Sequence, residues 1–388
     1  MAKTKPSQRS KKNKKSKGVN GASKPNESPE VLLAQSQTFL QQSELEQALV
    51  KAQKALALLQ PSEEPTIVSL PALMLCGEIC VELGDIDTAR DYFSVAAVVD
   101  PEGGVSEEAG GGAEKFFWLA QLSEEGGQES VGCFEQGADV LRKQIGDLEG
   151  RKSTPEIQTL LSDKRRKLAN ALCGIAEIYM TDLSWDDAEA EEQCNRATTE
   201  ALLIAPDVPE TLQTIASVRI SQNKRDEARE YLGKSLNLWK DLDLGDTRVP
   251  DFPTRISLAR LLMEAEMEDE AMEVLERLVS EDDSSIEAWY LGGWCQHLMA
   301  EKQTQEQVNG SSQAQDVLKR SRRWLSQCLK LYQLLDYEDD RLREHADELV
   351  AGLNKILGEP LAEWEEGDDD EDWEDEEDSS GDEVMNGT

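Results

Sequence analysis

The stretch LPALMLCGEICVELGDIDTARDYFSVAAVVDP, residues 70–101, decides the fold. Its apolar residues recur at the spacing of an α-helix in two runs, which a turn containing glycine separates. The landmarks are a small residue in the first run, a glycine in the turn, a small, an aromatic and a small residue in the second run, and a final proline: Gly77, Gly84, Ala89, Phe93, Ala96 and Pro101. This order predicts two antiparallel helices that approach closely where small residues face each other.

The spacing between Gly77 and Ala89 recurs along the chain. The matching pairs of small residues are Ser36 and Ala48, Gly77 and Ala89, Ala176 and Ala188, Ala216 and Ala228, and Ala259 and Ala271. A tetratricopeptide (TPR) repeat is a helical pair of about 34 residues with small residues at its eighth and twentieth positions. The chain therefore resembles a TPR array. The resemblance implies an all-α fold, a TPR-like superhelical solenoid of about six to seven helical-hairpin repeats.

The end of the array has its own signals. The last repeat opens at residues 288–293, and a polar insert at about residues 301–315 predicts a loop before a second helix at residues 317–331. The segment Asp340–Leu357 is amphipathic. We expect it to form a capping helix, because the open end of a solenoid requires a polar outer face.

Both ends of the chain differ in composition from the middle. Residues 1–28 hold nine Lys or Arg and no acid before Glu27, whereas residues 359–388 hold sixteen Asp or Glu and no Lys or Arg. Neither segment can bury a core, so both are predicted to be disordered. We expect a basic arm at residues 1–28, a TPR-like domain at residues 29–358 and an acidic tail at residues 359–388.

The charge limits the classes of partner. The chain has 79 Asp and Glu against 41 Lys and Arg, a formal net charge of -38. Without the nine cations of the arm and the sixteen acids of the tail, residues 25–358 still carry -31. Direct binding of nucleic acid is not expected, since every phosphate contact would form against a repulsive field. A membrane span is not expected either, because no apolar run of about eighteen residues exists.

These features predict an intracellular protein. The basic start lacks the apolar segment of a signal peptide, and seven scattered cysteines inside apolar stretches fit reduced thiols. The cluster Lys11, Lys12, Lys14, Lys15 and Lys17 is either a nuclear-import signal or part of a solubilising tail. We expect the protein in the cytoplasm and the nucleus, with nuclear import factors as further partners under the first interpretation.

Motifs of catalysis are absent from the sequence. It holds only two histidines, His297 and His345, and no phosphate-binding loop, GxSxG elbow or paired-histidine helix. Cys76 and Cys80 fall on the predicted core face of a helix, where structural thiols are expected rather than metal ligands. We therefore predict no enzyme activity, no cofactor and no metal site.

A TPR stack curves, and its inner wall is formed mainly by set positions of each first helix. In this register the predicted partner-binding residues combine carboxylates with apolar, mostly thioether or aromatic, side chains: Met74, Glu78, Glu82, Glu177, Met180, Glu210, Ile220, Met263, Glu264, Glu287, Tyr290 and Trp294. Such a groove suits an extended basic segment, although a very acidic chain carries Glu on every surface. Leu33 and Gln37 stand where TPR domains that bind acidic chaperone ends need Lys and Asn, so that ligand is not expected.

In this order the features resemble the fungal dedicated assembly chaperones of large-subunit ribosomal protein L-four. The resemblance rests on the Lys-rich start, the degenerate repeats, and the motifs EAWYLGGW at residues 287–294 and LAEWEE at residues 361–366. It implies a chaperone that captures the long, basic, unstructured internal loop of the new ribosomal protein, prevents its aggregation and accompanies it into the nucleus. The alternative is a TPR scaffold subunit of a stable multiprotein complex, which the repeats allow equally well.

Overall fold

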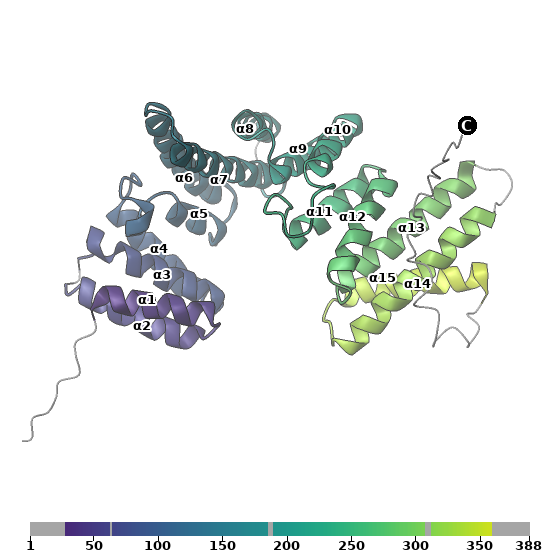
Figure 1. Cartoon of the computed structure of the whole chain (residues 1–388), viewed down its shortest axis with the longest axis horizontal. Helices are drawn as coiled ribbons and strands as arrows, with labels where there is room; N and C mark the ends of the chain where they lie inside the picture. The colour runs from purple at the N-terminus through teal and green to yellow at the C-terminus, as the bar shows by residue number, and fades with distance from the viewer. Residues whose placement is uncertain (1–27, 63, 185–188, 307–311, 359–388) are drawn as a thin grey trace, which may run out of the picture. The chain divides into compact units, whose positions relative to one another are not determined.

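The computed structural model describes residues 28–62, 64–184, 189–306 and 312–358. These residues form fifteen α-helices and two short 3-10 helices, η1 (Ile67–Ser69) and η2 (Glu107–Ala109), without a strand (Figure 1). Fourteen helices follow one another as seven hairpins and one helix ends the series, so the predicted all-α, TPR-like fold is confirmed. The acidic tail, residues 1–27 of the basic arm and Ala188 lie outside the described residues. No described helix is long and apolar enough to cross a membrane.

Contacts divide the chain into two compact units, residues 1–144 and residues 145–388. The hairpins that begin in unit 1 are α1 (Pro29–Gln41) with α2 (Leu45–Leu59), α3 (Leu70–Glu82) with α4 (Ile86–Val99), and α5 (Glu114–Gln121) with α6 (Gly127–Glu149). Those of unit 2 are α7 (Pro155–Met180) with α8 (Ala190–Ile204), α9 (Pro209–Ser221) with α10 (Arg225–Asn237), α11 (Phe252–Glu264) with α12 (Glu268–Glu281), and α13 (Ile286–Glu306) with α14 (Ser312–Leu334), followed by α15 (Asp340–Leu357). The predicted single domain at residues 29–358 stays a prediction.

Four of the hairpins share one turn geometry. After the first helix comes a residue with positive φ, and these residues are Ser43, Gly84, Asn223 and Glu266. The next backbone N–H then donates to the carbonyl five residues before it: Glu44 to Phe39, Asp85 to Cys80, Lys224 to Arg219 and Met267 to Leu262. This is the Schellman arrangement that closes α-helices. Only Gly84 adopts the positive φ without strain, so the second repeat has the clearest turn signal in the sequence.

Small residues bring the two helices of a hairpin together, as their spacing predicts. A Cβ atom on Gly77 would lie 2.6 Å from the Phe93 ring. In the first hairpin the buried Ser36 hydroxyl donates to the Ala48 carbonyl at 2.7 Å. The other described alanines of the predicted pairs are fully buried: Ala89, Ala176, Ala216, Ala228, Ala259 and Ala271. Larger side chains at these positions would force the helices apart.

The last hairpin is longer than predicted. The polar insert at residues 301–315 was expected to be a loop, but α13 continues to Glu306 and α14 begins at Ser312, so the expectation is wrong for these described residues. The insert is rich in Gln and also holds Glu301, Lys302 and Glu306, all of them good helix formers. The described residues of the insert therefore extend the two helices of the hairpin.

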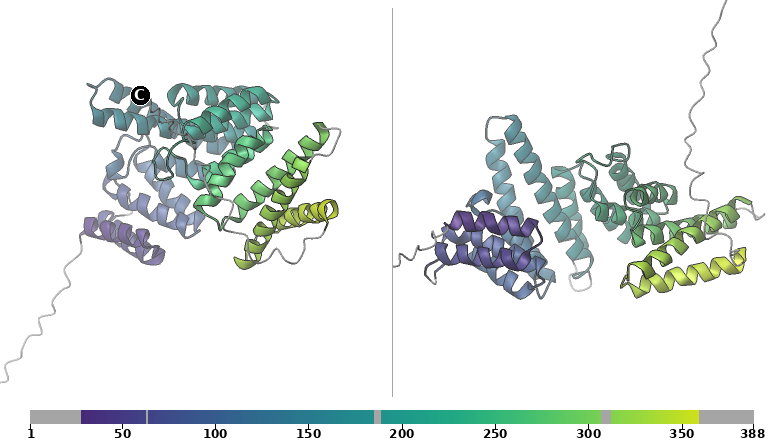
Figure 2. Two further views of the ribbon diagram at one scale, coloured as in Figure 1. Left: turned by 45° about the vertical axis from the view of Figure 1, so that its right-hand side comes forward. Right: turned by 60° about the horizontal axis from the view of Figure 1, so that its bottom comes forward.

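The capping helix α15 begins and ends as predicted. It lies beside α14 (Figure 2), where Ala346 and Leu353 pack against Leu325. A Cβ atom on Gly293 of α13 would lie 2.6 Å from Leu325 Cγ, so the same close approach joins α13 to α14. Leu325 therefore connects the last hairpin with its cap.

A buried ion pair that the sequence pattern did not reveal organises the Gly-rich loop before α5. The Lys115 ammonium donates to Asp100 Oδ2 at 3.0 Å and to the Gly112 carbonyl at 2.6 Å. Asp100 Oδ1 also accepts from the backbone N–H groups of Gly104 and Val105. Both charged side chains are almost fully buried. Removing either partner would leave an uncompensated charge in the core, so the pair fixes the loop.

Replacing Gly77 with Ala tests the close approach between helices. Alanine stabilises a helix interior by about 1 kcal/mol relative to glycine. Here the added methyl group collides with Phe93, and overpacking costs about 1–3 kcal/mol. We therefore expect Gly77→Ala to lower the free energy of unfolding in urea. The matched control is Gly132→Ala in α6, where nothing lies within 4 Å of the added atom and stability should rise. Stabilisation by Gly77→Ala would show that the helices do not need this gap.

Candidate functional site

The first helices of the repeats in unit 2 lie side by side. α9 contacts both α7 and α11, and α11 also contacts α13 (Figure 1). An open pocket of about 390 Å³ lies on three of these helices. Its lining residues are Glu177 from α7, Glu210, Gln213, Thr214 and Ser217 from α9, and Thr254, Ser257, Arg260 and Leu261 from α11. The repeat geometry thus gathers polar side chains of three first helices around one hollow.

The pocket combines hydroxyl groups with two carboxylates. Thr214 Oγ1 on α9 donates to Glu177 Oε1 on α7 at 3.4 Å. Burial among helix atoms raises the pKa of Glu177, and this hydrogen bond offsets part of the rise. Glu210 lies in the first turn of α9, where the helix dipole favours a negative charge. Glu177 is nevertheless exposed and Glu210 half-buried, so both carboxylates are open to a cationic partner.

Arg260 is a pocket residue that the prediction did not include. Its guanidinium on α11 donates to the Glu287 carboxylate on α13. The pocket is therefore lined by two carboxylates and one cation, and the predicted contact Glu287 already has a partner within the chain. The signal that could have identified Arg260 is its place in the repeat, since it follows the small Ala259 as Glu177 follows Ala176.

The other predicted contacts lie in different environments. Met74 and Met263 are buried in hydrophobic clusters and expose little surface to a partner. Glu78 on α3 is half-buried, and burial, with a smaller effect of the Glu114 carboxylate, raises its pKa. Four predicted contacts are half-buried or exposed and do not line the pocket: Glu82, Met180, Ile220 and Glu264. A role of these residues in binding stays a prediction.

Tyr290 and Trp294 contact the capping helix and do not line the pocket. The Tyr290 hydroxyl hydrogen-bonds with Nδ1 of His345 on α15 at 2.7 Å. The Trp294 ring meets the His345 ring edge-on, with centroids 5.2 Å apart. Burial raises the pKa of Tyr290, so its hydroxyl stays protonated and available for this bond. The two aromatic residues therefore hold α15 against α13, which reduces the surface they offer to a partner.

Metal clusters are not found in the part of the chain that the structure describes. There, no group of three or more His, Cys, Asp or Glu side chains could hold a metal ion. All seven cysteines are free thiols. Burial raises the pKa of Cys76 to about 12, and the neighbouring Cys80 adds to the rise. A buried, protonated thiol acts as a packing residue.

The helical hairpins, their shared turns and the small-residue contacts define a repeat protein of the TPR type. No known protein-family model matches the sequence. A protein of Emericella nidulans described as "Probable assembly chaperone of rpl4" is 46% identical over 363 residues, which cover 90% of this chain and 89% of that protein. A Schizosaccharomyces pombe protein with the same description is 34% identical over 341 residues, which cover 86% of this chain and 94% of that protein.

A solved structure extends the similarity to the fold. It is described as "Assembly Chaperone of RpL4 (Acl4) (Residues 1-338)", is 49% identical, and superposes with a TM-score of 0.64 over 72% of this chain and 99% of that chain. Identity of this level over nearly the whole length shows common descent. The chain belongs to the family of assembly chaperones of rpl4.

Replacing Tyr290 with Phe tests how α15 is held. Loss of the hydroxyl leaves His345 without this hydrogen bond, which costs about 1 kcal/mol and should raise the open population of α15 about fivefold. Trypsin cleavage after Arg341 and Arg343 on α15 should accelerate by that factor. The control is Tyr337→Phe, because the Tyr337 hydroxyl has no hydrogen bond within the described residues. Equal cleavage rates in the two variants would contradict docking through Tyr290.

Proposed function

We propose that the chain is a dedicated, non-enzymatic chaperone of newly made rpl4, the large-subunit ribosomal protein L-four. It binds the basic, unstructured internal loop of this client on the first helices of its repeats and prevents its aggregation. It then escorts the client from the cytoplasm into the nucleus, where import factors are its further partners. The client is suggested by three relatives that are described as assembly chaperones of rpl4. The observation that carries the binding mode is the pocket on α7, α9 and α11 with its two carboxylates.

The chemistry of the pocket suits a Lys or Arg side chain. Glu177 and Glu210 come from adjacent helices and offer carboxylate acceptors, and the nearby hydroxyl groups accept further hydrogen bonds from an ammonium or guanidinium group. Arg260 on the α11 side repels a second cation, so a bound cation is directed toward α7 and α9. A volume of about 390 Å³ admits side chains of an extended segment rather than a folded domain.

Long-range charge supports the same client class. Residues 25–358 carry -31, and a field of this sign draws a cationic segment toward the chain before any contact forms. Basic segments of this kind cannot fold until counter-charge is supplied, which in the ribosome comes from RNA phosphates. A chaperone that binds only the unassembled client stabilises it by mass action.

Affinity purification of the full-length chain at low salt, followed by mass spectrometry, tests the client. We expect rpl4 as the predominant partner, released as the salt concentration rises because the attraction is screened. Recovery of a fixed set of several subunits in constant ratio would contradict the proposal and would favour a scaffold of a stable complex.

Charge substitutions in the pocket should change the affinity for a basic loop peptide in opposite directions. Glu177→Gln combined with Glu210→Gln should weaken binding about tenfold, since each partly exposed ion pair contributes up to about 1 kcal/mol. Arg260→Gln should strengthen binding about threefold, because it removes the repelling cation. The matched control is Glu230→Gln combined with Glu276→Gln on the second helices, which changes the net charge equally outside the pocket lining.

Fluorescence anisotropy at constant ionic strength measures these affinities. The control variant should change the dissociation constant less than about twofold. If it weakens binding as much as the pocket variant does, net charge rather than the pocket recognises the peptide.

The raised pKa of Glu177 predicts a pH dependence of binding. In the free chain this carboxylate takes up a proton at a higher pH than an ordinary glutamate, whose pKa is about 4.3. A bound cation stabilises the ionised form, so binding lowers the pKa of Glu177 and releases its proton. The affinity should therefore be constant above the free-state pKa and fall as the pH drops below it. In Glu177→Gln the fall should begin at a lower pH, and an unchanged profile would contradict this coupling.

A further inference from the structure

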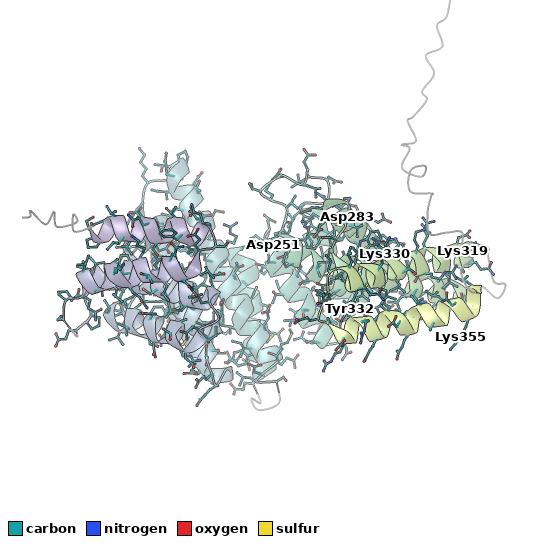
Figure 3. The ribbon with its side chains drawn as sticks, turned by 90° about the horizontal axis from the view of Figure 1, so that it is seen from below. Asp251, Asp283, Lys319, Lys330, Tyr332 and Lys355 are labelled. Atoms are coloured by element: carbon teal, nitrogen blue, oxygen red, sulfur yellow. The ribbon has the colours of Figure 1, made fainter. Side chains whose placement is uncertain are left out.

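α14 is the most basic helix of the described chain. It holds five Lys or Arg and one Asp, a net charge of +4 in a protein of net charge -38. Four of these cations are exposed and are called the basic face: Lys319, Arg320, Arg323 and Lys330. Lys319, Arg323 and Lys330 are spaced by four and seven residues, so they stand on one stripe of the helix. Figure 3 shows Lys319 and Lys330 along α14.

The charges of the basic face are largely uncompensated. Lys319 pairs with Asp316 at 3.0 Å, but these side chains are 59% and 61% exposed, and such pairs contribute little. Within the described residues, Arg320, Arg323 and Lys330 form no ion pair. The basic face is therefore a surface with capacity for an anionic partner.

The described chain ends beside this face. α15 runs antiparallel to α14, because Leu342 at its start packs with Tyr332 while Arg322 reaches its end. The Arg322 guanidinium donates to the Gly358 carbonyl at 2.8 Å and to Asn354 Oδ1 at 3.2 Å. Arg322 lies in the same turn of α14 as Arg323. In Figure 3, Lys355 of α15 and Lys319 lie toward the same end of this helix pair. The acidic tail starts at the next residue, Glu359.

We propose that the acidic tail, residues 359–388, docks on the basic face of α14 in the same chain. Residues 368–378 hold ten Asp or Glu in eleven positions and begin ten residues after Gly358. Ten extended residues span up to about 33 Å, whereas Lys319 and Lys330 lie about 17 Å apart along the helix. The acidic run therefore reaches the whole basic face while α15 stays folded.

The tether makes weak ion pairs sufficient. A connection of about ten residues gives the tail an effective concentration on the order of millimolar at the basic face. RNA, by contrast, has to approach a body of charge -31 with a tail of charge -16 attached. A second copy of the chain meets the same repulsion. The tail of the same chain is thus the anion that reaches α14 at the lowest electrostatic cost. Its docking is salt-sensitive, because salt screens exposed charges and the Debye length is about 8 Å at physiological salt.

Carbodiimide cross-linking of the full chain, which joins lysine amines to carboxylates directly, tests the proposal. We expect Lys319 and Lys330 to link to residues 368–378 at about 50 mM salt, and the yield to fall about tenfold at about 0.5 M salt. A mixture of isotope-labelled and unlabelled chains distinguishes links within one chain from links between chains. Links mainly between chains would overturn the proposal in favour of a second copy.

Arg320→Gln combined with Arg323→Gln removes half of the basic face and leaves both reporter lysines in place. The yield of the lysine–tail links should fall about fivefold at low salt. The matched control, Arg151→Gln combined with Arg196→Gln, removes two exposed cations elsewhere and should leave the yield unchanged. Equal yields in the two double variants would overturn the proposal. So would a single-stranded RNA probe that binds the full chain through Arg320 and Arg323 while the cross-links are absent.

Discussion

The close approach of two helices inside each repeat is the constraint on which the rest of the structure depends. At Gly77 and Gly293 no side chain separates the first helix from the second, so an aromatic ring or a leucine packs directly on the helix backbone. Each hairpin is thereby a rigid unit with its first helix in a set position. Repetition of that unit brings the first helices α7, α9 and α11 side by side. The pocket forms where side chains from these three helices come together.

In the proposed function, charge acts at two ranges. The acidic body would attract a cationic client over the distance of the Debye length, without specifying where the client binds. The pocket adds direction, since Glu177 and Glu210 lie on one side and Arg260 on the other. Exposed carboxylates on the second helices, such as Glu276, are well hydrated and contribute to the field rather than to a defined contact.

The structural features that could be predicted are those whose sequence pattern repeats along the chain. The spacing of small residues such as Gly77 and Ala89 indicated the hairpins, because two helices approach closely only where small residues face each other. The apolar period of α15 indicated the capping helix. Contacts between different repeats were not predictable, because they depend on the side chain that the neighbouring first helix presents. The pairing of Arg260 with Glu287 is of this kind, and so is the covering of Tyr290 by His345. Helical register also could not show whether Met74 and Met263 face the inner wall of the stack or the hydrophobic core. Both side chains are buried, with 7% and 8% of their surface exposed.

Hydrogen–deuterium exchange of the full chain with and without rpl4 tests the central claim most directly. If the first helices bind the client, the backbone amides of α7, α9 and α11 gain protection from exchange. The amides of the second helices α8, α10 and α12 should change little. The variant with Glu177→Gln and Glu210→Gln should lose this protection at the same client concentration. Protection confined to the second helices or to α14, with no change in α7, α9 and α11, would contradict binding on the first-helix layer.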